Sequence, residues 1–183
     1  MKRIVLRFGL ASGVILVALS SVLWAVTMNE AIDLEGSEVI GYSAMVLSFL
    51  LVFFGVRSYR DTVAGGAIGF GKAFQVGLLI TLITCAMYVI TWEIAYFNFF
   101  PDFLDEYTTR ALAKMRAEGE SAAAIQKMEG QMAFMAKYYD NIFFNSAITL
   151  LEVFPVGLIV SLISAAILRR KPAEAAPAAT AIA

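Results

Sequence analysis

Histidine is absent from the 183-residue chain, and cysteine occurs once, as Cys85. The absence of histidine excludes Ser-His and Cys-His nucleophilic pairs, histidine metal ligands and a histidine pH switch. A single cysteine cannot form a disulfide within the chain, and Cys85, inside an apolar run, is best interpreted as a small buried hydrophobe. We therefore predict a protein that is not an enzyme, with no catalytic, cofactor-binding or metal-binding residues and no cofactor.

Charged residues are also scarce. They make up 16% of the chain, and the formal net charge is −1. This balance gives no electrostatic reason to expect nucleic acid as a partner. Hydrophobic residues make up 60% of the chain, whereas a typical soluble domain has about 45–50%. The excess is concentrated in blocks, which indicates a protein whose main partner is the lipid bilayer.

Four apolar segments are long enough to span a bilayer, which takes about 20 helical residues. They cover about residues 6–28, 39–56, 73–97 and 147–168. Helices are expected because open strands leave backbone groups unpaired in hydrocarbon, and the alternation of a β-barrel is missing. The first segment starts like a signal peptide, with MKRIVLR. Its apolar run exceeds the usual length of about 7–15 residues, so we predict that it is retained as an anchor.

The basic residues predict the orientation, because they concentrate in cytoplasmic flanks. Nine of the 14 lysines and arginines flank the spans on one side: Lys2, Arg3, Arg7, Arg57, Arg60, Lys72, Arg169, Arg170 and Lys171. The connection NEAIDLEGSE, on the opposite side, has four acids and no base. Both termini are therefore predicted to be cytoplasmic. Residues 1–171 form a single membrane domain in this interpretation, and 172–183 form a disordered tail.

The insert between the third and fourth spans, about residues 98–146, is predicted to be an extracytoplasmic helical hairpin. A first helix opens after Pro101 and ends near Gly119, and Ser121 can cap a second helix. Apolar residues recur along the second helix at steps of three and four: Ile125, Met128, Met132, Met135, Tyr139 and Ile142. This stripe indicates either packing of the hairpin on itself or on the membrane, or a docking face for a partner or lipid.

Three further patterns bear on how the helices connect and pack. Asn141 and Asn145 do not break a helix, so the second hairpin helix can run on into the fourth span. The glycines of residues 65–71 do not match a phosphate-binding spacing and indicate a connector. Small residues at helical steps, such as Gly9 with Gly13 and Gly157 with Ser161, predict close helix packing, within one chain or between two copies.

Two carboxylates, Glu93 and Glu152, lie in the third and fourth apolar segments. A charged group at mid-bilayer costs about 2.5–3.5 kcal/mol, so such residues are candidates for function. Counted along the helices from the basic flanks, both lie in the outer third of the bilayer and could face each other. Tyr96 and Thr149 each lie one turn away and could supply hydrogen bonds. The hypothesis is an ion or proton site; the alternative is an interfacial Glu93 and a neutral packing role for Glu152.

Two stretches resemble a known family. They are GGAIGFGKAFQVGLLITLI, leading into the third span, and LLEVFPVGLIVSLISAAILRRK, at the end of the fourth. Together with the four-span layout, they resemble the bacterial membrane-protein family catalogued as the domain of unknown function numbered forty-one ninety-nine. The resemblance implies a small integral protein of the bacterial inner membrane. It implies no catalytic residue and no assigned activity.

The prediction is an all-α membrane protein: a four-helix transmembrane bundle with a helical hairpin between spans three and four. The first functional hypothesis is a non-enzymatic structural or interaction role through the hairpin, with a second copy or another membrane protein as partner. The alternative is a small oligomeric channel or carrier that uses the membrane carboxylates for a cation or proton. The spans contain few polar residues and no visible inverted repeat, which disfavours a carrier.

Overall fold

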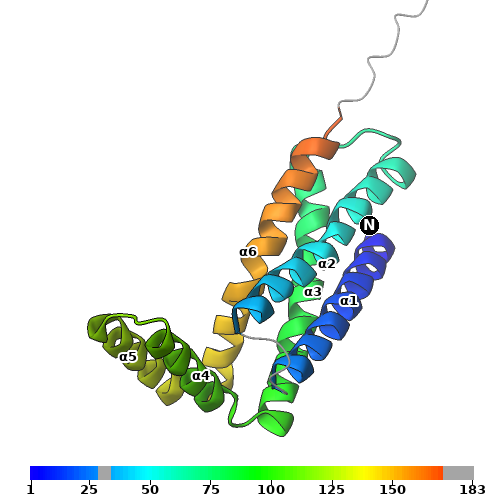
Figure 1. Cartoon of the computed structure of the whole chain (residues 1–183). Coiled ribbons are helices and arrows are strands. Elements are labelled where there is room, and N and C mark those ends of the chain that lie inside the picture. Colours follow the sequence, from blue (N-terminus) through cyan, green and yellow to red (C-terminus); the bar gives the residue numbers. More distant parts are fainter. Residues whose placement is uncertain (29–33, 171–183) are drawn as a thin grey trace, which may run out of the picture.

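The computed structural model of the chain describes residues 1–28 and 34–170, and these residues form six helices and no strand (Figure 1). The helices are α1 (Lys2–Met28), α2 (Leu34–Thr62), α3 (Phe70–Phe99), α4 (Phe103–Ala117), α5 (Ala122–Tyr139) and α6 (Ile142–Leu168). Helices α1, α2, α3 and α6 are long and apolar enough to cross a membrane. They contain the four predicted spans, so the all-α, four-span prediction is confirmed. The predicted tail, residues 172–183, lies outside the described residues.

The four long helices pack side by side as a bundle, and α3 contacts α1, α2 and α6 (Figure 1). The side chains between them are apolar and fully buried, as Leu16, Phe49 and Ile80 show. The outer faces are apolar as well: Leu151 is 68% exposed and Ile167 is 65% exposed. A soluble monomer rarely exposes a large continuous apolar surface. Four such helices with apolar outer faces indicate a multi-pass membrane protein.

The small residues bring helices together within the chain. A methyl group added at Gly157 of α6 would lie 2.5 Å from Thr81 Cγ2 and 2.7 Å from Phe49 Cε1. One added at Gly9 of α1 would lie 2.8 Å from Ile83 Cβ. Real carbon atoms do not approach so closely, so a side chain at either position would force its neighbours to shift. These small-residue faces, which the sequence assigned either to one chain or to two copies, are used inside a single bundle.

Hydroxyl groups supplement this packing in the apolar interior. The hydroxyls of Thr81 and Ser161 lie 2.9 Å apart and join α3 to α6. Ser12 donates to the backbone carbonyl of Ser48 over 2.9 Å and joins α1 to α2. Double-mutant cycles assign about 0.6 kcal/mol on average to such bonds in membrane helices. They fix the register of the helices more than they stabilise them.

One end of the bundle, here called the basic end, carries the N-terminus, the α2–α3 connection and the end of α6 (Figure 1). The sequence placed nine basic residues at this end, and Lys171 alone among them lies outside the described part of the chain. Ile68, in the α2–α3 connection, forms an antiparallel backbone bridge with Arg170. Each residue donates its amide to the carbonyl of the other, over 3.0 Å and 2.9 Å.

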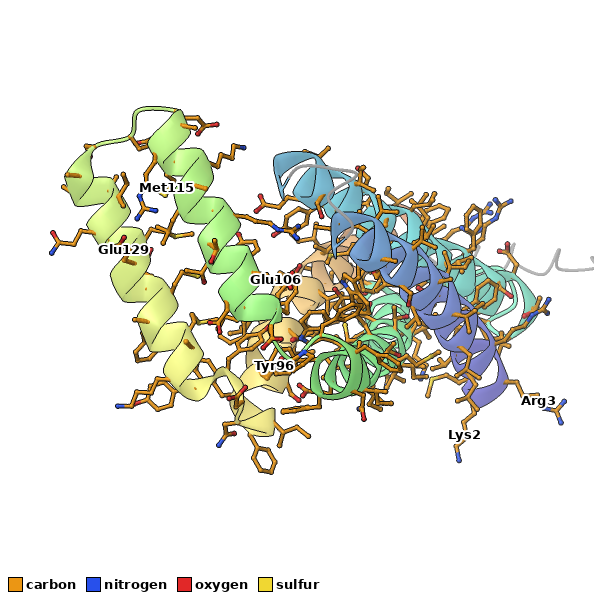
Figure 2. The ribbon with its side chains drawn as sticks, turned by 60° about the horizontal axis from the view of Figure 1, so that its bottom comes forward. Lys2, Arg3, Tyr96, Glu106, Met115 and Glu129 are labelled. Atoms are coloured by element: carbon orange, nitrogen blue, oxygen red, sulfur yellow. The ribbon has the colours of Figure 1, made fainter. Side chains whose placement is uncertain are left out.

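At the opposite end, α4 and α5 lie side by side and project away from the bundle (Figures 1 and 2). The chain reverses between them at Gly119, whose φ of +75° is a left-handed conformation that glycine adopts readily. Ser121 then caps α5, as predicted, since its Oγ accepts from the amide of Ala124 over 3.2 Å. Here the two helices are called the α4–α5 pair.

The possibility that α5 continues into the fourth span was wrong. Helix α5 ends at Tyr139, and α6 begins at Ile142. Asn141 separates them because its side chain accepts from the amides of Phe143 and Phe144, which would otherwise lack partners in the first turn of α6. Asparagine is among the best residues at this capping position, and its extended backbone ends the preceding helix. The break allows α5 to leave the direction of α6.

The methionine stripe of α5 faces inward. Tyr139 is buried, and Ile125, Met128, Met132 and Met135 are half-buried; Ile142, at the start of α6, is exposed. Met132 and Met135 pack with Leu104 of α4 and with Trp92 and Tyr96 of α3 in one apolar cluster. The sequence allowed two interpretations of the stripe. In the structure, this part of it packs against α4 of the insert and against α3 of the bundle. Met132 and Met135 are therefore already in contact with residues of α3 and α4.

Candidate functional site

A cavity of about 440 Å³ lies where the α4–α5 pair meets the bundle. Ligand pockets commonly have volumes of about 300–1,000 Å³, so a small molecule fits. All six helices line the cavity, here called the aromatic pocket. Its residues are Ser20, Leu23, Trp24 and Thr27 of α1; Ser37, Glu38, Gly41, Tyr42 and Met45 of α2; Tyr88 and Trp92 of α3; Phe103, Leu104, Tyr107 and Arg110 of α4; Met132, Met135 and Tyr139 of α5; and Ile148, Thr149 and Glu152 of α6.

Seven of the 21 lining residues are aromatic, and several of them pack against one another across helix boundaries. The rings of Trp24 and Trp92 lie 4.9 Å apart and join α1 to α3. The rings of Trp92 and Phe103 lie 4.9 Å apart, edge to face, and join α3 to α4. Such pairs contribute about 0.5–1.5 kcal/mol each beyond the area they bury. Packed aromatic rings thus form part of the pocket wall.

Polar contacts attach α4 to the bundle at the edge of the pocket. Arg110 donates from Nη1 to the carbonyl of Thr27 over 2.8 Å, at the end of α1. The same guanidinium lies 3.5 Å from Glu106 Oε2, one turn earlier on α4. The hydroxyls of Thr27 and Ser37 lie 2.9 Å apart and join the ends of α1 and α2. The Arg110–Thr27 bond therefore attaches α4 to the end of α1 beside the pocket.

Two tyrosines of the α4–α5 pair remain protonated at neutral pH. Burial raises the pKa of Tyr139 to about 12. Burial raises the pKa of Tyr107 as well, with a smaller effect from the nearby Glu38 carboxylate. The Tyr107 hydroxyl donates to Glu38 Oε1 over a long 3.5 Å. Both phenols are therefore neutral groups that can donate a hydrogen bond inside the pocket.

Of the four residues predicted to form an ion or proton site, two line the pocket. Glu152 has an accessible side chain, although it lies inside a candidate span. Among residues 1–28 and 34–170, no hydrogen-bond or salt-bridge partner is present for its carboxylate. Thr149, one turn away, donates to Asn145 Oδ1 over 3.3 Å rather than to Glu152. Glu152 is thus a carboxylate that faces an open cavity.

The other two predicted site residues lie outside the pocket. Glu93 is 8% exposed, and its Oε1 accepts from the Ser146 hydroxyl over 2.7 Å. Tyr96 donates to Asp140 Oδ1 over 2.8 Å rather than to Glu93. Ser146 precedes Glu152 by six residues, or about 9 Å along α6. The structure therefore separates Glu93 from Glu152, and only Glu152 and Thr149 share a cavity.

Most of the pocket was not recognised in the sequence. Glu38 was counted among the acids of a loop, but it lies in the second turn of α2. The sequence did contain a signal. Trp24, Trp92 and Tyr88 lie toward the C-terminal ends of α1 and α3, and Tyr42 lies near the N-terminal end of α2, which is the same end of the bundle. Aromatic residues at matching depth on three spans are typical of the belt that lies at a membrane–water interface. A pocket could not be inferred from them, because the sequence does not place the α4–α5 pair.

The residues of the pocket do not form a metal site. Within the part of the chain that the structure describes, no group of three or more histidine, cysteine, aspartate or glutamate residues could hold a metal ion. Hard cations such as Ca²⁺ require six to eight oxygen ligands. The donors here are two carboxylates and several hydroxyls among aromatic rings, which suits an organic molecule better than a bare metal ion.

Comparison with known proteins gives one match. A family model described as a protein of unknown function (DUF4199) matches residues 7–170. No curated protein and no solved structure matches the chain. The matched region covers all six helices except the first five residues of α1, so it includes every residue of the aromatic pocket.

Proposed function

The chain belongs to the DUF4199 family of proteins of unknown function, and from that premise we propose that it is a non-enzymatic, multi-pass membrane protein that binds a small molecule in the aromatic pocket. The observation that supports the proposal is the cavity itself. Its size suits a small molecule, and its walls combine aromatic rings with a few polar groups, which is the usual composition of a ligand site.

The proposal revises the role of the insert. The sequence suggested that the insert acts through its methionine stripe, but Met132 and Met135 line the pocket. We therefore assign the α4–α5 pair the role of a wall and cover for the ligand. An interaction with a second copy or another membrane protein would have to use its outer surface, where Phe134 is 57% exposed.

The alternative role as a channel or carrier keeps one supporting observation, which is that Glu152 lines the pocket within a span. Against an open passage, the side chains immediately beyond the pocket toward the basic end are fully buried: Leu16, Phe49, Ile80 and Val153. Closely packed cores of this kind leave no continuous water path. We therefore favour a binding role over conduction.

We also propose an orientation, with the basic end in the cytoplasm of a bacterial cell and the aromatic pocket on the outer side of the inner membrane. The support is the distribution of charge. At the basic end, lysines and arginines dominate the short flanks, and such flanks favour the cytoplasm. The pocket would then sample molecules outside the cytoplasm or in the outer leaflet.

The test uses tryptophan emission. The chain has two tryptophans, and both line the pocket, so their fluorescence reports on its contents. Purified protein in phosphatidylglycerol nanodiscs is titrated with three probes of similar shape: cyclohexylmethanol, cyclohexylmethylammonium and cyclohexanecarboxylate. We expect at least one probe to change the emission saturably. If none of them does, the proposed function is wrong.

A pair of variants shows whether the response comes from the pocket. Gly41→Leu adds a side chain to the lining, and the first added carbon meets Leu23 at an ordinary 3.5 Å. Gly130→Leu adds the same group on α5, where no atom lies within 4 Å. Gly41→Leu should weaken probe binding about tenfold or more through loss of space, and Gly130→Leu should leave it unchanged. Equal responses would show that the probes report on lipid rather than on the pocket.

A further inference from the structure

The charge inside the aromatic pocket is unbalanced. Three charged residues line it: Glu38, Arg110 and Glu152. The Arg110 guanidinium already bonds to the Thr27 carbonyl and lies beside Glu106. Glu152 has no hydrogen-bond or salt-bridge partner within the described residues, and Glu38 has only the long contact from Tyr107 there. The pocket lining therefore carries two carboxylates against one guanidinium, and that guanidinium is bonded to the Thr27 carbonyl rather than to either carboxylate.

The position of Glu152 makes this imbalance costly. Glu152 lies ten positions after the first residue of α6, which is about 15 Å along the helix from its N-terminal end. An ionised carboxylate at such a depth in a membrane protein needs a proton or a positive partner. Glu38 lies nearer the α4–α5 end of the bundle, four residues after the start of α2. The two carboxylates thus mark the deep and the shallow part of one cavity.

The aromatic walls complement a cation in a second way. The face of an aromatic ring attracts a positive group, and tryptophan does so most strongly. Both tryptophans of the chain and four tyrosines line the pocket. Rings combined with carboxylates form the kind of cage that recognises alkylated ammonium groups. A bare metal ion gains little from such rings and requires more oxygen ligands than two carboxylates supply.

Resting on the proposed function, we propose that the ligand is an organic cation, a molecule with an ammonium group attached to an apolar body. The ammonium group pairs with Glu152 in the deep part of the pocket, and the apolar body lies against the rings and Met132 and Met135. Glu38 attracts the cation nearer the α4–α5 end of the bundle. The ammonium can belong to a free amine or to the headgroup of a lipid, since the recognised chemistry is the same.

The three probes test the charge preference directly. In phosphatidylglycerol nanodiscs, which contain no ammonium group, cyclohexylmethylammonium should bind about tenfold more tightly than cyclohexylmethanol, and cyclohexanecarboxylate should bind most weakly. If the alcohol or the carboxylate binds as tightly as the ammonium, the inference is overturned while the proposed function stands. If no probe binds, the proposed function itself fails.

Matched variants identify the groups responsible. Glu152→Gln and Glu38→Gln each remove one negative charge at constant shape, and each should reduce the preference for the ammonium probe over the alcohol. Glu152→Gln should bring the ratio close to one. Glu93→Gln is the control, because Glu93 is also in a span but lies outside the pocket; the ratio should remain that of the wild type. Retention of the full preference in both pocket variants would contradict the inference.

A second arm distinguishes the sources of the cation. Phosphatidylethanolamine is added to the nanodiscs in increasing fractions, and the dissociation constant of the ammonium probe is measured again. Competition that grows with the fraction of this lipid, and that Glu152→Gln abolishes, supports a lipid headgroup as the ligand. An unchanged dissociation constant supports a free amine.

Discussion

Trp92 Nε1 donates a hydrogen bond to Asn145 Oδ1 over 3.0 Å, between two buried side chains that are 53 positions apart in the sequence. The same oxygen accepts from the Thr149 hydroxyl. The contact joins α3 to α6 near the N-terminal end of α6, and it orients an indole that lines the aromatic pocket. A helix-to-helix contact therefore also determines the shape of the candidate site.

We predict that Asn145→Ala loosens this end of the bundle. The substitution leaves the Trp92 indole N–H buried without a partner, at a cost of about 1–3 kcal/mol. Thermal unfolding in detergent should shift to lower temperature, and the tryptophan emission spectrum should change in the folded protein. Asn98→Ala is the control, because Asn98 is exposed and donates only to the carbonyl of Ile94 in its own helix. An emission spectrum identical to that of the wild type would show that the bond does not hold Trp92.

We predict that Gly157→Ala destabilises the protein by about 1–3 kcal/mol, because the added methyl group overlaps Thr81 and Phe49. Gly130→Ala should instead stabilise the protein. No atom lies within 4 Å of a methyl group there, and alanine favours a helix over glycine by about 0.5–1 kcal/mol. Denaturant titration of both variants measures the difference. Equal stabilities would show that α6 does not approach α2 and α3 this closely.

The proposed orientation predicts the labelling of introduced cysteines. Cys85 is buried, so Cys85→Ala provides a background with little change. Glu120→Cys, in the turn of the α4–α5 pair, should react with a membrane-impermeant maleimide on intact cells. Val63→Cys, in the exposed α2–α3 connection, should react only after the membrane is opened. Labelling of both cysteines in intact cells, or of neither, would contradict the orientation.

The raised pKa of Tyr139 predicts a pH dependence of stability. Burial raises this pKa to about 12, whereas an exposed tyrosine has a pKa of about 10. Between about pH 10 and pH 12 the folded state keeps a proton that the unfolded state has released, so stability falls as pH rises. The Tyr139→Phe variant has no phenol at this position, so its stability does not fall for this reason. Between about pH 9 and pH 12, the wild type should lose about 1–2 kcal/mol of unfolding free energy relative to Tyr139→Phe. A difference that stays constant over that range would contradict the burial of this phenol.

The fold was largely predictable because its main determinant is the solvent. Long uncharged segments can only be helices in a bilayer, and this rule places α1, α2, α3 and α6 without any tertiary information. The capping of α5 by Ser121 was predictable for a similar reason, since it depends on residues that are adjacent in the sequence. Asn141 was misinterpreted because asparagine tolerates a helix and also caps one, and the choice depends on where the next helix must go.

The candidate site was less predictable. Depth along a helix follows from counting residues, and the count predicts that Glu152 lies nearer the end of the bundle at which the α4–α5 pair lies. The facing direction does not follow from depth, because it depends on the rotation of each helix. Glu93 and Glu152 were expected at similar heights, but Glu93 bonds to Ser146 and Glu152 faces a cavity. The cavity itself depends on where the α4–α5 pair lies against the bundle. No pattern of neighbouring residues in the sequence predicts that position.

The bridge between Ile68 and Arg170 has a consequence for any transport role. It ties the α2–α3 connection to the end of α6, so these two parts of the basic end cannot separate while its two backbone bonds persist. An alternating-access cycle that delivered a ligand to the cytoplasm would have to break this backbone bridge and then re-form it. Under the proposed function, a bundle that keeps this bridge would exchange its ligand only at the α4–α5 end, as a receptor or reservoir does, and would perform no work on a concentration gradient.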